Sequence, residues 1–184
     1  MVLGGDSDAF ADLVRAYEAR VRGLCLSLLS DPIEAEDAAQ EAFVKAFTFL
    51  SRYKRDFSFP AWLCRIASNH CLDLLRKRTR HKTDSLDALV EQKGEQIHSL
   101  AMGDPLSSEG GDETIAKTKW AKQVLTSLSP DHRQILVLRE LEGFSYDEIS
   151  VILECSLDAV KGRLRRARQE LQQKSATLLE RENV

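Results

Sequence analysis

Basic side chains are concentrated near the C-terminus of a chain that is acidic overall. The 184 residues carry a formal net charge of -3, yet the stretch VKGRLRRAR at 160–168 contains five cationic side chains: Lys161, Arg163, Arg165, Arg166 and Arg168. Guanidinium and ammonium groups bind phosphate oxygens, and Arg also recognises guanine edges in the major groove of DNA. The stretch therefore predicts either a nucleic-acid-binding surface or the solvated face of a helix.

A helical wheel at about 100° per residue separates this stretch into two faces. The apolar face predicted to pack on the rest of the protein is Val160, Leu164, Ala167 and Leu171. Gly162, Arg165 and Arg166 point the other way. A glycine inside an exposed helix costs about 1 kcal/mol relative to alanine, and here it would let the backbone approach DNA closely. Arg165 or Arg166 could then contact bases while the flanking cations contact phosphates.

The elements before this basic helix position it. Ser145 and Glu148 form a capping-box pattern, which predicts a short helix ending near Leu153. A tight turn follows, and Ser156 can cap the basic helix. Short helix, turn and longer basic helix together form the helix-turn-helix pattern. Upstream, we predict one helix over about 114–128 and another that begins at Ser129-Pro130 and ends at Gly143.

Aromatic and basic residues are also combined near the middle of the chain. Phe57, Phe59 and Trp62 lie beside a predicted turn, and Asn69 and a basic run at 76–82 follow on a helix that begins near Pro60. Unpaired bases stack on aromatic rings while Lys and Arg bind phosphates, which is the chemistry of single-strand binding. The same aromatic residues could equally belong to the hydrophobic core.

A helix predicted over about 32–50 is acidic and amphipathic. Asp31 is its expected N-cap, Pro32 its first residue, and Glu34 lies in its first turn. Its apolar stripe is Ala39, Ala42, Phe43, Ala46, Phe47 and Leu50. Its opposite face carries Asp37, Gln40, Glu41, Val44, Lys45 and Thr48. Composition alone does not distinguish this face from an ordinary solvated surface.

Composition narrows the class of protein. Leu, Ala, Glu, Arg and Lys outnumber β-branched and aromatic residues, which favours an all-α fold. The acidic, weakly periodic block around 84–112 predicts a flexible linker, so we expect two small helical domains at 1–82 and 113–184 joined by a linker at 83–112. No apolar run approaches the length of about 20 residues that a membrane span requires, and we expect no secretory signal. The four cysteines are expected to be buried free thiols.

Catalytic and metal-binding patterns are missing from the sequence. Cys64, His70 and Cys71 do not have the spacing of a metal site, and there is no phosphate-binding loop or nucleophile elbow. We therefore expect neither an enzyme nor a cofactor. A Cys/His metal-dependent sensor or enzyme stays an alternative that metal analysis of the purified protein would decide.

Two separate blocks of the sequence resemble the extracytoplasmic-function (ECF) group of bacterial RNA polymerase sigma factors. DAAQEAFVKAF followed by FPAWLCRIASNHCLDLLRKR is similar to region 2 of that family. LSPDHRQILVLRELEGFSYDEISVILECSLDAVKGRLRRAR is similar to region 4. The order of the blocks and the joining segment match a two-domain sigma factor. The resemblance implies promoter recognition and DNA melting together with polymerase in the cytoplasm, often under the control of an anti-sigma factor.

The resemblance also implies a role for each group of residues. The surface for core RNA polymerase, with its β and β′ subunits, would be Asp37, Gln40, Glu41, Val44 and Lys45. The −10 element would be read by Phe57, Phe59, Trp62, Arg65, Asn69, Asp73, Arg76 and Lys77, with Asn69 near a base flipped out of the duplex. The −35 element would be read by Ser156, Asp158, Lys161, Gly162, Arg163, Arg165, Arg166 and Arg168. The acidic linker would thread polymerase towards its active site.

One alternative to a sigma factor is a regulator that needs no polymerase. A two-domain helix-turn-helix protein could bind operator DNA by itself. Such a protein would have no use for the polar face of the acidic helix. Transcription with core polymerase distinguishes the two, because only a sigma factor starts it.

Overall fold

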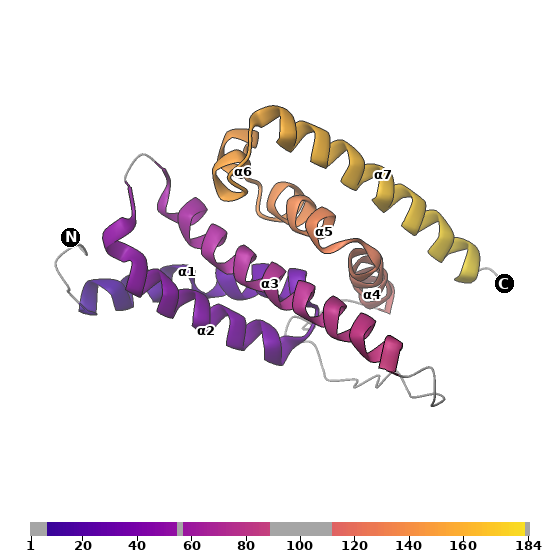
Figure 1. Cartoon of the computed structure of the whole chain (residues 1–184), viewed down its shortest axis with the longest axis horizontal. Coiled ribbons are helices and arrows are strands. Elements are labelled where there is room, and N and C mark those ends of the chain that lie inside the picture. Colours follow the sequence, from indigo (N-terminus) through magenta and orange to yellow (C-terminus); the bar gives the residue numbers. More distant parts are fainter. Residues whose placement is uncertain (1–6, 55–56, 89–111, 183–184) are drawn as a thin grey trace.

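The protein is all-helical, as the sequence predicts. The computed structural model describes residues 7–54, 57–88 and 112–182, and in these ranges every regular element is a helix (Figure 1). In chain order these elements are α1 (Ser7–Leu29), α2 (Pro32–Phe49), the short 3-10 helix η1 (Leu50–Arg52), α3 (Phe59–Ala88), α4 (Asp112–Ser127), α5 (Pro130–Leu136), the π-helical turn η2 (Val137–Leu141), α6 (Tyr146–Ile152) and α7 (Leu157–Glu182).

Helices α1, α2 and α3 pack together as a three-helix bundle. Leu24 and Leu28 of α1 and Leu63 of α3 are almost fully buried in it, and α2 contributes mainly alanines, which let the helices approach closely. The predicted start of α2 is confirmed, because Asp31 Oδ1 accepts hydrogen bonds from the backbone N–H groups of Ile33 at 2.9 Å and Glu34 at 3.0 Å.

One position on the predicted apolar stripe of α2 differs from expectation. Phe47 is 48% exposed, whereas the other five stripe residues are buried. The ring of Phe47 lies edge-on against Phe10 near the start of α1, with the centroids 4.9 Å apart. Phe47 lies in the last turn of α2. It is on the same face as the other stripe residues, but the bundle covers its side chain only in part.

Helix α3 is longer than the sequence pattern predicts. It continues to Ala88, past the expected end of the first domain at Lys82. The sequence contains no Pro or Gly between Pro60 and Gly94, so nothing in the chain terminates the helix at the predicted boundary. Most of the predicted flexible linker, residues 89–111, lies outside the described residues.

The predicted helix-turn-helix is present in the second half of the chain. Ser145 and Glu148 form the expected capping box at the start of α6. Glu154 has a left-handed φ of 49° in the turn, and Ser156 Oγ accepts a hydrogen bond of 3.2 Å from the Ala159 backbone N–H at the start of α7. The residues of α7 that pack against the preceding helices are Val160, Leu164 and Ala167, each at most 1% exposed.

The helix expected between Ser129 and Gly143 is not a continuous α-helix. It begins at Pro130 as predicted, but after Leu136 it widens into the π-helical turn η2, and Gly143 with φ of 73° follows. Ser129 occupies the N-cap position without using its hydroxyl as a cap. That hydroxyl donates instead to Glu170 Oε2 of α7 at 3.1 Å.

The two groups of helices pack against each other. Helices α5 and α6 contact α3, and Figure 1 shows α4–α7 along one side of the α1–α3 bundle. The buried residues of both groups form one hydrophobic cluster. Arg133 of α5 is only 6% exposed, and its Nη1 donates to the Leu28 carbonyl oxygen at the end of α1 at 2.6 Å. The described residues therefore form one packed body.

Candidate nucleic-acid interface

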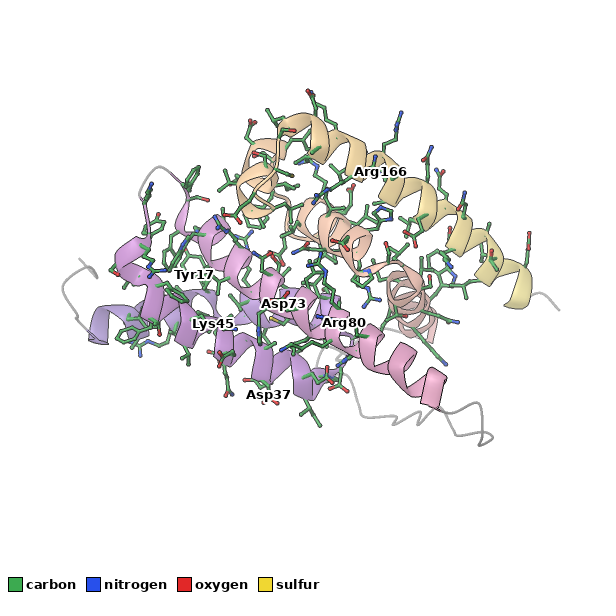
Figure 2. All side chains as sticks on the ribbon, viewed as in Figure 1. Tyr17, Asp37, Lys45, Asp73, Arg80 and Arg166 are labelled. Carbon is green, nitrogen blue, oxygen red and sulfur yellow. The ribbon has the colours of Figure 1, made fainter. Side chains whose placement is uncertain are left out.

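The outer face of α7 is basic and open to solvent. Lys161, Arg165 and Arg166 are exposed and Arg163 is half-buried. Within the described part of the chain, Arg165 and Arg166 make no ion pair or hydrogen bond. Figure 2 labels Arg166 on α7, on the opposite edge of the molecule from Asp37 of α2. Two guanidinium groups are thus available to a ligand on the helix that the fold presents outward.

Two cations that flank Arg165 and Arg166 on α7 are paired with carboxylates. Arg168 Nη2 donates to Glu140 Oε1 of η2 at 2.8 Å. Lys161 Nζ lies 3.5 Å from Asp158 Oδ1, one turn earlier on the same helix. These pairs partly neutralise the two cations, so Arg165 and Arg166 carry most of the unpaired charge on this surface.

Glycine at position 162 is not required by any of the residues that the structure describes. A Cβ added there would contact only Arg166 Nη1, at 3.6 Å, which is an ordinary van der Waals distance. The residue nevertheless costs helix stability relative to alanine. The described residues thus give no reason for glycine at this position, and any such reason would lie in a contact with another molecule or with a residue outside the described ranges.

An aromatic and basic hollow of about 420 Å³ lies where the loop before α3 meets that helix. Its volume is within the range of pockets that hold small molecules. The residues that line it are Phe49, Arg52, Lys54, Phe57, Trp62, Arg65 and Ile66. Phe57, Trp62 and Arg65 were expected in a nucleic-acid site. Phe49, Arg52 and Lys54 were missed, although the alternation of aromatic and basic residues in FTFLSRYKRDF is a signal that could have identified them.

The aromatic residues expected in this site divide between core and surface. Phe59 packs among Tyr17, Tyr53 and Trp62, with ring centroids 5.5, 5.6 and 5.7 Å away respectively. Phe57 is 43% exposed at the rim of the hollow. The core alternative therefore holds for Phe59, whereas Phe57 is open to solvent and its role in nucleic-acid binding stays a prediction.

The other expected residues of α3 follow one another along its exposed side. Asn69, Asp73, Arg76 and Lys77 are all exposed, and Asp73 is labelled in Figure 2. Two of them contact the second group of helices. Asn69 Oδ1 accepts a hydrogen bond of 3.4 Å from Gln134 Nε2, and Arg76 Nη2 lies 2.9 Å from Asp131 Oδ1. Arg65 in the hollow likewise forms an ion pair with Glu154.

The polar face of α2 is exposed on a different side of the molecule. Asp37, Gln40, Glu41 and Val44 are exposed, and Val44 reaches 60%. A groove of about 460 Å³ lies between α2 and α3 and is lined by Glu34, Asp37, Ala38, Glu41, His70, Leu74, Lys77 and Arg78. This surface combines carboxylates with one exposed apolar side chain, and such a composition alone does not distinguish a protein-binding face from an ordinary solvated surface.

Lys45 is half-buried at the edge of this face. Its Nζ donates to His70 Nδ1 at 2.9 Å and lies 3.5 Å from Glu41 Oε1. Burial, and next the positive charge of Lys45, lower the pKa of His70 below its usual value of 6.5. A neutral imidazole is thus favoured as the acceptor. The sequence does not predict a contact between His70 and α2, because the Lys45–His70 contact joins two different helices.

The fold and these surfaces define a helix-turn-helix DNA-binding protein with a second, aromatic-lined basic site. Residues 13–81 match the family of sigma-70 region 2, and residues 119–171 match sigma-70 region 4. The RNA polymerase sigma-H factor of Pseudomonas aeruginosa is 36% identical to this chain over 178 residues, covering 95% of this chain and 90% of that protein. The ECF RNA polymerase sigma factor SigW of Bacillus subtilis is 34% identical, covering 91% and 89%.

A solved structure is similar over most of the chain as well. It is the sigma factor RpoE in complex with the anti-sigma factor NepR from Bartonella quintana, with a TM-score of 0.66 and 27% identity over 90% of this chain and 96% of that one. The chain belongs to the ECF group of sigma-70 factors. It recognises promoters and initiates transcription together with RNA polymerase. None of the described helices is long and apolar enough to cross a membrane.

Proposed function

We propose that α7 reads the −35 element in the major groove. The observation that carries this proposal is the pair of unpaired, exposed guanidinium groups of Arg165 and Arg166 beside Gly162 on the second helix of a helix-turn-helix. Arginine binds the O6 and N7 atoms of guanine with two parallel hydrogen bonds. Lys161 and Arg163 lie beside them, where they can reach phosphates. Ser156 and Asp158 lie in the first turn, next to the DNA edge of the helix.

The hollow at the start of α3 is the proposed site for an unpaired base of the −10 element. Phe57 and Trp62 supply stacking surface, and Arg52, Lys54 and Arg65 supply charge for the phosphates around it. Asn69, Asp73, Arg76 and Lys77 would continue the contact along α3, while Phe59 holds the wall in place. Capturing bases in this way offsets the unstacking cost of a few kcal/mol per base that DNA melting requires.

The polar face of α2 is the proposed docking surface for core polymerase. Asp37, Gln40, Glu41 and Val44 are exposed on it and Lys45 lies at its edge. The face is remote from Arg166 of α7, whereas Lys77 of the proposed −10 surface lines the same groove as Asp37 and Glu41. Polymerase can therefore hold the protein without covering the outer face of α7. We place the contact on the clamp helices of the β′ subunit, with β forming further contacts.

In the proposed function the protein is a binding factor rather than an enzyme. Polymerase supplies the chemistry in the cytoplasm, and this chain supplies promoter choice. Two recognition modules at 1–82 and 113–184, joined by a linker at 83–112, gain avidity when polymerase holds them at promoter spacing. An anti-sigma factor is the proposed regulator, since the similar sigma factor RpoE was solved with one.

Run-off transcription with purified core polymerase tests the proposal. We expect initiation from a promoter selected by the assembled holoenzyme, and none from core polymerase alone. The competing proposal, a regulator that binds operator DNA by itself, predicts the opposite pattern. In that case the free protein shifts duplex DNA, and adding core polymerase starts no transcription.

A further inference from the structure

A contact between α2 and α3 fixes the ammonium group at the edge of the proposed polymerase-docking face. Lys45 Nζ of α2 lies 2.9 Å from His70 Nδ1 of α3 and 3.5 Å from Glu41 Oε1, one turn earlier on α2. A lysine ammonium sits on a flexible stem, so an exposed lysine samples many positions. Partners on two different helices restrict Lys45 to one of them.

The chemistry of the two groups decides which of them donates. A lysine ammonium has only N–H donors, so Nδ1 of His70 is the acceptor. Nδ1 therefore carries no proton, and the single proton of the neutral ring is on Nε2. The contact exists only while His70 is uncharged, because protonation would make Nδ1 a second donor that faces the ammonium.

Charged groups face His70 from both helices that form the groove. Glu41 and Lys45 face it from α2, and Asp73 and Lys77 from its own helix. Burial lowers the pKa of His70 most and the charge of Lys45 next, while the two carboxylates oppose this shift. Three further charged residues line the same groove: Glu34, Asp37 and Arg78. The balance of these groups favours the neutral ring near neutral pH.

A charged His70 would change the docking face in two ways. Two cations 2.9 Å apart repel each other, so the ammonium of Lys45 would leave its place beside the ring. The imidazolium would also compete with Lys45 for the carboxylate of Glu41. Gln40 on the same face is held differently, since its Nε2 donates to Glu36 Oε1 within α2 at 3.3 Å. The influence of His70 on the face therefore passes through Lys45 and Glu41.

We propose that His70 is a positioning residue for polymerase binding, and that its neutral ring holds Lys45 and Glu41 in the arrangement that core polymerase recognises. The inference rests on the docking role proposed for α2 and assigns no polymerase contact to His70 itself. Protonation of His70 disrupts this arrangement, so assembly with core polymerase weakens in mildly acidic solution. The sign follows from linkage, because the docked protein favours the neutral ring and binds fewer protons than the free protein.

Substitutions separate the acceptor at position 70 from its charge. His70→Asn supplies an amide oxygen close to the position of Nδ1, so it keeps an acceptor for Lys45 but does not titrate. His70→Leu removes both properties, and Lys45→Ala removes the group through which His70 acts. His132→Asn is the matched control, because it removes another titrating ring, which lies in α5 and pairs with Glu170 of α7.

The experiment measures the affinity of each full-length variant for purified core polymerase. The protein carries a fluorophore at its N-terminus and is titrated with polymerase at about pH 7.5 and about pH 5.5, on either side of the usual histidine pKa of about 6.5. Affinities are expressed relative to His70→Asn at the same pH, which cancels the pH dependence of polymerase itself. Calorimetric melting shows that each variant is folded at both pH values.

We expect wild type to lose about three- to tenfold in affinity relative to His70→Asn between the two pH values, since one proton changes an equilibrium by at most about tenfold per pH unit. His132→Asn should follow wild type. At the higher pH, His70→Leu should bind about two- to tenfold more weakly than His70→Asn, because it leaves the ammonium without its acceptor. In a Lys45→Ala background the same change should have no further effect.

Equal pH profiles for wild type and His70→Asn would overturn the inference, and so would equal weakening by His70→Leu with and without Lys45. Either result, with Lys45→Ala still weakening binding, leaves the docking role of α2 standing. If His70→Leu does not fold, the comparison of wild type with His70→Asn decides alone. Failure of wild type to bind core polymerase at either pH would overturn the docking role, and the inference with it.

Discussion

Replacing Gly162 by alanine should make the protein more stable and a poorer promoter reader. Alanine is favoured over glycine inside a helix by about 1 kcal/mol. The new Cβ meets only Arg166 Nη1, at 3.6 Å, so no steric cost cancels the gain. In a chain of this size about 1 kcal/mol raises the melting temperature by about 2–4 °C.

The effect of the same methyl group on DNA binding has the opposite sign. If the backbone at Gly162 lies against DNA, the added group overpacks that interface at a cost of about 1–3 kcal/mol. Such a cost lowers initiation that depends on the −35 element by about five- to 150-fold. The assay is competitive run-off transcription from two templates that differ only in that element, alongside calorimetric melting of the free protein.

Gly23→Ala is the matched control. Gly23 lies in the interior of α1 and is exposed, and a Cβ added there would have no described atom within 4 Å. The change should therefore give a similar gain in stability without loss of promoter activity. If Gly162→Ala stabilises the protein and leaves −35-dependent initiation unchanged, the backbone of α7 does not approach DNA closely at this position. The orientation proposed for the helix would then be wrong.

Three further predictions concern the outer face of α7, the aromatic hollow and the capping box of α6. Arg165→Ala should weaken −35-dependent initiation by about 1–3 kcal/mol, while Lys174→Ala, an exposed cation further along α7, should not; equal selectivity among −35 variants argues against a base contact. Phe57→Ala should make the free energy of promoter opening about 1–3 kcal/mol less favourable without unfolding the protein. Permanganate reactivity of the opened promoter measures this loss. The Ser145 backbone N–H bond lowers the pKa of Glu148 from its usual 4.5, so this stabilisation is present above about pH 4.5 and is lost as the pH falls further. Glu148→Gln should therefore make thermal stability less sensitive to acid, and an unchanged pH profile would refute that linkage.

Local features of the fold followed directly from the sequence. The caps at Asp31 and Ser156 and the capping box at Ser145 were predictable because a cap depends on residues within one turn. The buried stripe of α7 was predictable for the same reason, since Val160 and Leu164 repeat at the helical period. The extension of α3 to Ala88, beyond the first-domain boundary expected at Lys82, was not anticipated, because a change in charge does not stop a helix when no Pro or Gly is present.

Contacts between distant segments could not be predicted in this way. Arg65 and Asn69 carry no local sign that Glu154 and Gln134 will face them, because those partners lie more than 60 positions along the chain. The hollow was anticipated only in part, since it forms where η1, the following loop and α3 meet. The residue-level assignments of polymerase and DNA contacts stay predictions that rest on placement, exposure and charge.

Footprinting of a promoter with and without core polymerase tests the central claim most directly. We expect the free protein to protect neither element strongly, whereas the holoenzyme should protect both at once and make thymines near −10 reactive to permanganate. Strong protection of duplex DNA by the free protein, with no change and no melting when core polymerase is added, would contradict the assignment as a sigma factor.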